Sequence, residues 1–372
     1  MTDRERFNRQ MHFQSTDRCL NWEMGYWPEN FFQWNIFVNN GVRNNTEAKI
    51  FFALDKIANI GFTNIAGTAA GENFMCPPMK ERVLEVRGKT QVIMNTEGLL
   101  AEVPLESGRS SVPHYLRSSI VTPRDWKKIK EEHFDINHPG RKLNIPALKK
   151  KHLPDEGRDY PLGIHLGSMI GKVRNMLTFE GLAYAIYDYP EMVEDMVETC
   201  CQIAENLLDQ LLPEFKFDYA KTWEDICFKN GPIVGIDFFR DVVMPRYKRL
   251  DRKLKAYGID IFYTDCDGDV RPLLPYFLEG GVNCFYPHEV NSCGHPGELL
   301  DKYQGQLRIM GGVDKMILGK GKKAIKEYLK TLEKYVKRGG FIPFCDHHCP
   351  PNVKPDDYLY YLDLKETMFG KV

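Results

Sequence analysis

The chain has 372 residues, of which 43% are hydrophobic and 27% charged, so it can bury a large core and is neither disordered nor collagen-like. Its 50 Lys and Arg residues balance 51 Asp and Glu residues to a formal net charge of -1, and no run of like charge is longer than residues 149–151. This balance leaves no electrostatic footprint for nucleic acid, and we expect no polyanionic partner.

No window of the sequence approaches the roughly 20 apolar residues that a bilayer span needs, and no apolar stretch follows the first residues. We therefore expect a cytoplasmic protein without a membrane segment. The ten cysteines are diluted over a large chain and form no Cys-x-x-Cys motif, which favours reduced thiols. Spacing alone leaves open whether Cys266 and Cys345 are metal ligands or packing residues.

The N-terminal third is the less periodic part of the chain. Residues 46–60 have a helical pattern, and residues 91–103 predict a hairpin centred on Asn-Thr-Glu-Gly. Residues 135–160 hold three prolines and three consecutive lysines, which predicts a surface loop. The four aromatic residues Trp22, Tyr26, Trp27 and Trp34 either line a pocket for a flat substrate or belong to the core.

From residue 161 onward, short apolar runs alternate with amphipathic helical patterns. Strands are predicted over 161–166, 217–223, 259–264, 282–287, 307–311 and 341–344. Helices are predicted over 192–211, 238–257, 273–278, 299–303, 325–336 and 358–368. This alternation is typical of a parallel sheet with crossover helices. Because there is no Gly-x-Gly-x-x-Gly turn and no switch point, it favours an α/β fold of the (β/α)8 TIM-barrel type over a doubly wound sheet.

In such a barrel the reacting groups lie at the C-terminal ends of the strands and in the loops that follow. The residues at these positions are Tyr263, Asp265 and Asp267, His288 and Glu289, Asp314 and Lys315, Cys345 and His347, and, from earlier strands, His165, Trp223, Glu224 and Asp225. Carboxylates, thiols and imidazoles thus recur at one rim. That mixture is the ligand set expected of a zinc or similar divalent site.

Each of these motifs also has a structural interpretation. The Asp-x-Asp-Gly-Asp tract from residue 265 is about equally typical of a turn that caps a helix. Adjacent side chains such as His347 and His348 point in different directions, so one of them at most faces the barrel mouth. Glu289 fits a helix start, and Asp314 with Lys315 fits a simple ion pair. Their location at one end of the barrel is therefore more informative than any single motif.

Five motifs together carry a resemblance to a known family. They are Trp22-Glu23-Met24-Gly25, Trp223-Glu224-Asp225 with Lys229-Asn230-Gly231-Pro232, Asp267-Gly268-Asp269-Val270, Gly311-Gly312-Val313-Asp314-Lys315, and Asp346-His347 with Pro350-Pro351. Through them the chain resembles the uroporphyrinogen decarboxylase superfamily, and most its corrinoid-dependent, O-demethylase-like methyltransferase branch. The likeness covers nearly the whole chain and is strongest from about residue 221. It implies one TIM-barrel domain over residues 1–372, in which residues 1–110 form an N-terminal extension and hairpin excursion.

Decarboxylases of this superfamily carry an Arg-Gln-Ala-Gly-Arg motif that binds the carboxylates of the porphyrinogen. The acidic and aromatic stretch 22–27 stands in that region here. A substrate with many carboxylates would lose its bidentate arginine partners. Decarboxylation of uroporphyrinogen is therefore not the expected chemistry.

The methyltransferase branch binds zinc through a His-x-Cys pair and a final Cys. Asp265 and Asp267 align with that pair and His347 with or beside the final Cys, so the resemblance implies zinc held by harder ligands. The implied metal ligands are Asp265, Asp267, Glu289, His347 and Cys345. The implied catalytic residues are Asp267, Glu289, Tyr263 and Glu224, and the implied substrate-binding residues are Trp22, Glu23, Trp27, His165, Trp223 and His288.

The activity implied is removal of a methyl group from a small methoxylated, aromatic donor, with the metal polarising the ether oxygen. A corrinoid protein is the expected partner, because the chain lacks an Asp-x-His-x-x-Gly motif and cobalamin must then be carried by a separate protein. The oligomeric state stays open, with a homodimer as one option. One alternative is a metal-free decarboxylase or lyase in which Arg174, Lys229 or Lys315 binds a small acid, and another is a non-catalytic barrel that binds a tetrapyrrole or a corrinoid partner.

Overall fold

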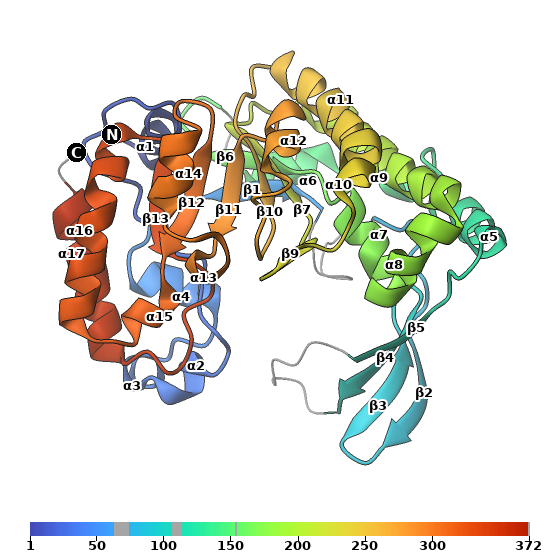
Figure 1. Cartoon of the computed structure of the whole chain (residues 1–372), viewed down its shortest axis with the longest axis horizontal. Helices are drawn as coiled ribbons and strands as arrows, with labels where there is room; N and C mark the ends of the chain where they lie inside the picture. Colours follow the sequence, from blue (N-terminus) through green and yellow to red (C-terminus); the bar gives the residue numbers. More distant parts are fainter. Residues whose placement is uncertain (63–73, 106–113, 153–154, 371–372) are drawn as a thin grey trace.

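The computed structural model describes residues 1–62, 74–105, 114–152 and 155–370. Its centre is a sheet of seven parallel strands in the order β1-β6-β7-β10-β11-β12-β13 (Figure 1). The strands are β1 (Ala58–Gly61), β6 (Leu162–His165), β7 (Tyr219–Trp223), β10 (Phe262–Asp265), β11 (Cys284–His288), β12 (Arg308–Val313) and β13 (Phe341–Cys345). The α/β class and all six strands predicted from residue 161 onward are thereby confirmed.

The order of the strands in this sheet follows their order in the chain and does not reverse. A doubly wound sheet would reverse at its switch point, whereas a β/α barrel would not. Among the described residues, no hydrogen-bonded pairing joins β1 to β13. The N-terminal segment contacts both of these outer strands, because Asp55 N, three residues before β1, donates to Asn21 O at 2.8 Å and Cys345 N donates to Glu23 Oε2 at 3.1 Å. An eighth strand and barrel closure remain predictions.

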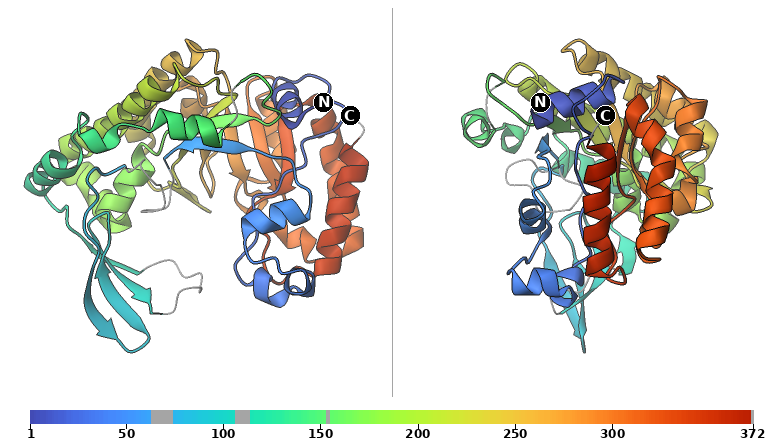
Figure 2. Two further views of the ribbon diagram at one scale, coloured as in Figure 1. Left: turned by 180° about the vertical axis from the view of Figure 1, so that it is seen from behind. Right: turned by 90° about the vertical axis from the view of Figure 1, so that its left-hand side faces the viewer.

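Helices follow almost every strand of the sheet (Figures 1 and 2). They are α7 (Ile170–Leu177), α8 (Phe179–Asp188) and α9 (Pro190–Leu211) after β6; α10 (Ile236–Phe238), a π-helical turn (Phe239–Val243) and α11 (Met244–Lys255) after β7; α12 (Leu274–Glu279) after β10; α13 (Val290–Cys293) and α14 (Pro296–Lys302) after β11; α15 (Lys315–Leu318) and α16 (Lys322–Arg338) after β12; and α17 (Pro355–Phe369). A two-stranded ribbon, β8 (Cys227–Phe228) and β9 (Gly231–Pro232), also follows β7. None of the helices in the described ranges combines the length and the apolar character that crossing a membrane requires.

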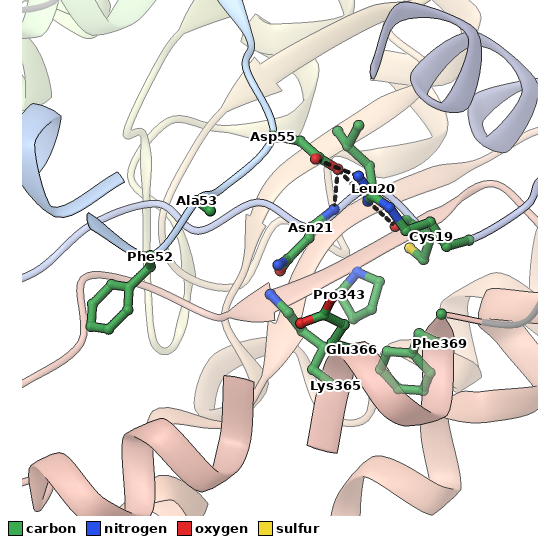
Figure 3. Close-up of a pocket in the computed structure, with 12 residues that line it drawn as sticks. Cys19, Leu20, Asn21, Phe52, Ala53, Asp55, Pro343, Lys365, Glu366 and Phe369 are labelled. Carbon is green, nitrogen blue, oxygen red and sulfur yellow. Dashed lines mark hydrogen bonds and ion pairs between the residues drawn. The ribbon is translucent and has the colours of Figure 1, made fainter. Parts of the chain in front are cut away.

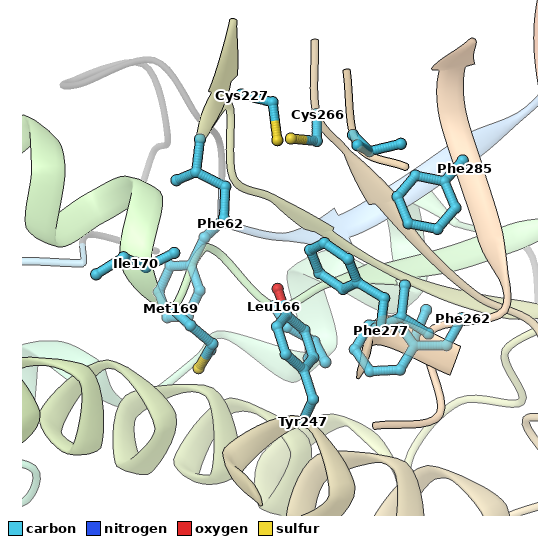
Figure 4. Packing of buried hydrophobic residues seen from close by; sticks show 14 of the residues in the cluster. Phe62, Leu166, Met169, Ile170, Cys227, Tyr247, Phe262, Cys266, Phe277 and Phe285 are labelled. Carbon is cyan, nitrogen blue, oxygen red and sulfur yellow. The ribbon is translucent and has the colours of Figure 1, made fainter. Parts of the chain in front are cut away.

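The strands bury side chains on both faces, which explains why their sequences are nearly continuous apolar runs. Residues on one face join the large cluster between sheet and helices, where Phe262, Phe277 and Phe285 pack together (Figure 4). Alternate residues such as Tyr263 and Tyr286 belong to a second cluster on the inner face. The period of two along each strand therefore separates an outer from an inner core.

The N-terminal helix α1 (Asp3–Met11) packs at the amino ends of the strands, near the end of α17 (Figure 2). Phe7 contacts the Tyr219 ring with centroids 5.2 Å apart, and Gln10 Nε2 donates to the carbonyl oxygens of Val336 and Phe341 at 2.9 Å. The helix thus covers the inner core at the end of the sheet opposite the predicted site. Three short helices follow: α2 (Asn30–Gln33), α3 (Asn35–Asn39) and α4 (Asn45–Phe51).

The predicted hairpin over 91–103 is confirmed and is part of a larger antiparallel sheet that extends away from the main body (Figure 1). This sheet has the order β2-β3-β4-β5, with β2 (Arg82–Arg87), β3 (Thr90–Met94), β4 (Leu99–Pro104) and β5 (His114–Ser118). In the central turn, Glu97 N and Leu99 N donate to Asn95 Oδ1 at 3.0 and 2.8 Å. All six residues of β2 are exposed, so no apolar alternation marks this strand in the sequence.

Two N-terminal predictions were wrong. The helix predicted over 46–60 ends at Phe51, and residues from Ala58 onward form β1, because pairing with β6 buries Ile60. The loop predicted over 135–160 holds a 3-10 turn (Pro139–Arg141) and α6 (Ile145–Lys151), although residues 153–154 lie outside the described ranges. Asn144 caps α6 by accepting from Ala147 N at 3.1 Å, and a proline in the first turn does not interrupt a helix.

A further helix, α5 (Pro123–His133), starts with a capping box formed by Thr122 and Asp125.

Candidate functional site

Three aspartates meet at the carboxyl ends of β7 and β10. One carboxylate oxygen each from Asp225, Asp265 and Asp267 lies within 4.8 Å of the other two. Asp265 ends β10 and pairs with Trp223, the last residue of β7, so Asp225 follows on the neighbouring strand end. Asp225 has a φ of +47°, which Asp tolerates better than most residues, and its Oδ1 accepts from Asp267 N at 3.0 Å. The two strand-end loops are thereby held together.

His347, which follows β13, adds an imidazole to this acidic cluster of Asp225, Asp265 and Asp267. Its Nε2 lies 3.5 Å from Asp267 Oδ2, and both side chains are partly exposed. Burial alone would lower the pKa of His347, but the Asp267 carboxylate outweighs it and the pKa is raised. Of the predicted ligands, Asp265 and Asp267 thus come from the end of β10, and His347 reaches Asp267 from the end of β13.

Two carboxylates of the acidic cluster, those of Asp225 and Asp265, are destabilised in their charged form. Burial, and then repulsion by Asp267, raises the pKa of Asp225 to about 6. Burial raises the pKa of Asp265 to about 8; the Lys221 ammonium opposes this shift, and Asp225 and Asp267 add to it. Asp267 Oδ1 is buried without a hydrogen-bond partner. A cation would relieve both the repulsion and the unpartnered oxygen.

The donor set fits a divalent cation. Three carboxylates and one imidazole offer oxygen and nitrogen ligands, which zinc accepts and which also suit harder ions such as Mn²⁺ or Mg²⁺. Asp225 is the member that sequence reasoning did not assign as a ligand. The signal that identifies it is the register, since it lies two residues past a strand end that pairs directly with Asp265.

Glu289, a predicted catalytic residue and ligand, lies beside this cluster but has other partners. Its Oε1 accepts from Lys315 Nζ at 2.7 Å and its Oε2 from Gly268 N at 3.1 Å. The ion pair with Lys315 leaves this carboxylate compensated without a metal. Its contact with Gly268 supports the loop that carries Asp267.

Glu224 points to the helix side of the sheet. Its carboxylate accepts from the backbone N–H groups of Met169, Ile170 and Gly171 at 2.9, 2.9 and 2.7 Å, and from Ser168 Oγ and the Tyr247 hydroxyl. These N–H groups belong to the first turn of α7, where a carboxylate satisfies unpaired donors and the helix dipole. The predicted catalytic residue Glu224 is thus fully buried as the cap of α7.

Glu23 and Cys345 belong to a buried network around α17. Glu23 accepts from the Tyr361 hydroxyl at 2.7 Å and from Cys345 N at 3.1 Å, and it pairs with Lys365 Nζ. Burial raises the pKa of the Cys345 thiol, and a hydrogen bond with Cys349 raises it further. Cys345 packs in the outer core and is not one of the three residues of the acidic cluster. Cys266 is also in the outer core, where its sulfur faces Cys227 (Figure 4).

The tryptophans predicted to bind substrate, Trp22 and Trp27, do not lie together. Trp22 is on the inner face, with ring centroids 4.9 Å from Phe344 and 5.9 Å from Tyr286. The predicted catalytic Tyr263 stacks there on Tyr219 at 5.4 Å. Trp27 is 37% exposed and has a backbone bond to Cys349.

The two histidines predicted to bind substrate, His165 and His288, are buried and uncharged near neutral pH. Burial lowers the pKa of His288 to about 4, and its Nε2 lies 3.0 Å from Gly294 O. Burial, followed by the nearby Lys221 charge, lowers the pKa of His165, whose Nδ1 has no hydrogen-bond partner. Trp223, at the end of β7, is partly exposed and lies 5.2 Å below the Arg174 guanidinium. Trp223 pairs directly with Asp265 of the acidic cluster, whereas His165 pairs with Lys221, two residues earlier on β7.

A separate cavity of about 120 Å³ lies between the N-terminal segment, β13 and α17 (Figure 3). Its charged groups are compensated, since Arg18 forms a bidentate ion pair with Asp55 at 2.5 and 2.6 Å and Lys365 pairs with Glu23. Asn21 N also donates to Asp55 Oδ2 at 2.7 Å. No group of metal ligands converges here in the described part of the chain, so the strand-end cluster is the better candidate.

Comparison with known proteins finds similar structures but no similar sequences. No protein-family model and no curated protein sequence matches the chain. The solved structure of a methyltransferase from Methanosarcina mazei is similar to it with a TM-score of 0.59, over 99% of each chain and at 10% sequence identity. At this identity the likeness shows a shared fold over the full length.

Proposed function

We propose that the chain is a methyltransferase that takes a methyl group from a small methoxylated, aromatic donor and passes it to a corrinoid carried by a separate protein. The observation that carries this proposal is the acidic cluster of Asp225, Asp265 and Asp267 with His347 beside it. The name of the structural neighbour, a methyltransferase, and the motifs shared with the corrinoid-dependent branch support the same activity.

For the fold, we propose that the N-terminal segment around Asn21 completes a closed (β/α)8 barrel.

The difficult step in this reaction is breaking the methyl–oxygen bond. Its electron pair stays on the oxygen, while the methyl carbon receives a new electron pair from the reduced corrinoid. Negative charge builds on the leaving oxygen, and an aromatic oxygen leaves more easily because its ring shares that charge. A divalent cation bound at the acidic cluster would supply Lewis-acid stabilisation of this charge.

The protein's own residues would hold the cation and orient the donor. Asp225, Asp265 and Asp267 come from two neighbouring strand ends whose loops are hydrogen-bonded to each other, so their spacing is fixed before binding. Glu289 braces the same loop through Gly268. The partly exposed Trp223 ring at the end of β7 offers a flat surface for an aromatic donor.

Metal binding tests the first half of the proposal. Protein stripped with a chelator is titrated with Zn²⁺, Mn²⁺ and Mg²⁺ by calorimetry, and Asp225→Asn and Asp267→Asn should each weaken binding at least 10-fold. Asp269→Asn is the matched control, because Asp269 lies on the same loop but pairs with Arg271 at 2.7 Å. Equal affinity in all three variants would remove the cluster as the metal site.

Methyl transfer tests the second half. The metal-loaded protein is incubated with a reduced corrinoid protein and anisole, 4-methoxyphenol or 4-methoxybenzoate, and methylcorrinoid formation is followed by absorbance. The proposal requires product with at least one donor and its loss in Asp267→Asn. A metal-free protein that instead removes carbon dioxide from a small acid would favour the decarboxylase alternative.

The three cationic residues named for the decarboxylase alternative either have partners already or are exposed. Arg174 contacts the Asp225 carbonyl oxygen and the Trp223 ring, Lys315 pairs with Glu289, and Lys229 is exposed. None of them is a buried cation without a partner. The decarboxylase alternative therefore needs a different carboxylate-binding group.

A further inference from the structure

We propose that Lys49 and Lys221 form a subsite for an anionic group of the substrate, so that the donor is a methoxylated aromatic carboxylate. The identity of the donor as a methyl source rests on the proposed function, whereas binding of the carboxylate does not. Lys49 is on α4 and Lys221 is on β7, and neither belongs to the acidic cluster.

Lys221 faces the inner core. On β7 it lies between Ala220 and Thr222, which face the helices, and it pairs with Tyr263 on one side and His165 on the other. Its Nζ lies 5.5 Å from the ring centroid of Tyr263 and 5.7 Å from that of Tyr286. The ammonium group is therefore surrounded by aromatic faces.

Lys49 reaches the same aromatic surface from the N-terminal segment. Its Nζ lies 4.4 Å from the ring centroid of Trp22, and Trp22 contacts Tyr286 with centroids 5.9 Å apart. The two ammonium groups thus lie over one continuous set of rings, formed by Trp22, Tyr286 and Tyr263. Both lysines are partly accessible to solvent, so an anion can reach them.

Within the described ranges, neither lysine ammonium group has a hydrogen bond or an ion pair, and each lies over an aromatic ring, while Asp265 acts on Lys221 and Glu23 acts on Lys49 only from a greater distance. The two most deeply buried lysines behave differently, because Lys172 pairs with Glu97 and Lys365 with Glu23. A desolvated ammonium without a counterion is unfavourable. Burial lowers the pKa of Lys49 to about 8; Glu23 opposes this shift and the Lys221 charge adds to it.

His165 supplies an independent sign of a missing ligand. Its side chain is 4% exposed, and Nδ1 has no hydrogen-bond partner. Ile164 and Leu166 on either side belong to the outer core, so His165 points to the inner face beside Lys221. A buried polar atom is normally satisfied, and a polar group of a ligand bound beside Lys221 would satisfy it.

A carboxylate matches this group of donors by charge and shape. The two ammonium groups can donate to its two oxygens, and the aromatic surface suits a planar ring. Asp265 is two residues further along β10 than Tyr263, the partner of Lys221, which is a rise of about 7 Å. A ring with a carboxylate at one end and a methoxy group at the other spans such a step toward the acidic cluster.

The test is a binding experiment without metal or corrinoid. Chelator-treated protein is titrated with 4-methoxybenzoate and with its uncharged analogue 4-methoxybenzamide, by calorimetry and by tryptophan fluorescence. We expect the carboxylate to bind at least 10-fold more tightly than the amide. Lys49→Met and Lys221→Met should each remove most of that preference and leave the affinity for the amide nearly unchanged.

Lys56→Met is the matched control, because Lys56 also lies over a tyrosine ring, with Nζ 3.4 Å from the Tyr160 centroid, but outside this subsite. Circular dichroism checks that each variant folds. Equal binding of carboxylate and amide, no binding of the carboxylate, or equal losses in Lys56→Met and Lys221→Met would overturn the subsite. Carboxylate binding with no methyl transfer would instead refute the proposed reaction and leave the subsite standing.

Discussion

The metal-free protein should lose stability as the pH rises, because the acidic cluster must then ionise without a counterion. The pKa of Asp265 is raised from 3.8 to about 8, by burial against the opposing effect of Lys221, and that of Asp225 to about 6. A folded-state pKa above the unfolded value means that the folded chain retains protons that the unfolded chain releases. The stabilisation is therefore complete below about pH 4 and is lost as the pH rises through 6 to 8.

The magnitude follows from the displacement of the pKa. Each tenfold change in proton affinity corresponds to 1.36 kcal/mol, so ionising Asp265 in the folded chain costs on the order of 5 kcal/mol. Asp225 is partly exposed and adds less, because solvent screens it. Against a typical unfolding free energy of 5–15 kcal/mol this loss is large.

Urea unfolding at pH 5, 6.5 and 8 in chelator buffer measures this effect. Asp265→Asn should flatten the decline and be more stable than the parent protein at pH 8. Asp269→Asn, on the same loop but paired with Arg271, should keep the parent slope. Adding Zn²⁺ at 100 times its Kd should restore about 2.7 kcal/mol at pH 8 in the parent. If the parent and Asp265→Asn decline in parallel, the three carboxyls are not electrostatically coupled and the basis for a cation site is lost.

Four further changes test the assigned roles. Glu224→Ala leaves the first-turn N–H groups of α7 unpaired and should cost about 3 kcal/mol in urea unfolding, with unchanged Zn²⁺ affinity by calorimetry. His347→Gln should lower Zn²⁺ affinity about 10-fold, because it removes the imidazole proposed as a metal ligand, and urea unfolding of the metal-free variant checks that the loss is not a folding defect. Lys365→Met should destabilise the chain by about 3–5 kcal/mol because Glu23 is left uncompensated, whereas Lys221→Met should leave the melting temperature unchanged or raise it.

The parallel sheet could be predicted from sequence because its strands are buried on both faces. β13 (Phe341–Cys345) reads as a continuous apolar run, and α16 before it carries Ile325, Leu329, Leu332 and Val336 on one face. β1 lacks this signal, since Ile60 is the one buried residue among its four, and it is identified by its pairing with β6. The exposed β2 lacks it as well. Pairing and packing, rather than local pattern, determine such elements.

The candidate site could be predicted only in part for a related reason. Counting residues past a strand end found Asp265, Asp267 and His347, which the structure brings together. Such counting does not give the face on which a side chain lies, so it predicts a catalytic role for Glu224, a residue that caps α7 in the structure. Lys221 was missed, although a lysine inside an otherwise apolar parallel strand is itself a signal.

The charges of the inner face and rim have an arrangement that stability alone does not explain. Elsewhere the chain neutralises buried charge by direct contact, as in Lys365 with Glu23 and Lys172 with Glu97. Lys221 and Asp265 lie on adjacent strands and influence each other's pKa, yet no ion pair joins them within 4 Å. Direct pairing would neutralise both groups. Their separation instead leaves a positive group without a direct partner beside an acidic cluster in which Asp267 alone pairs, with His347, and the proposed cation and substrate anion would neutralise both.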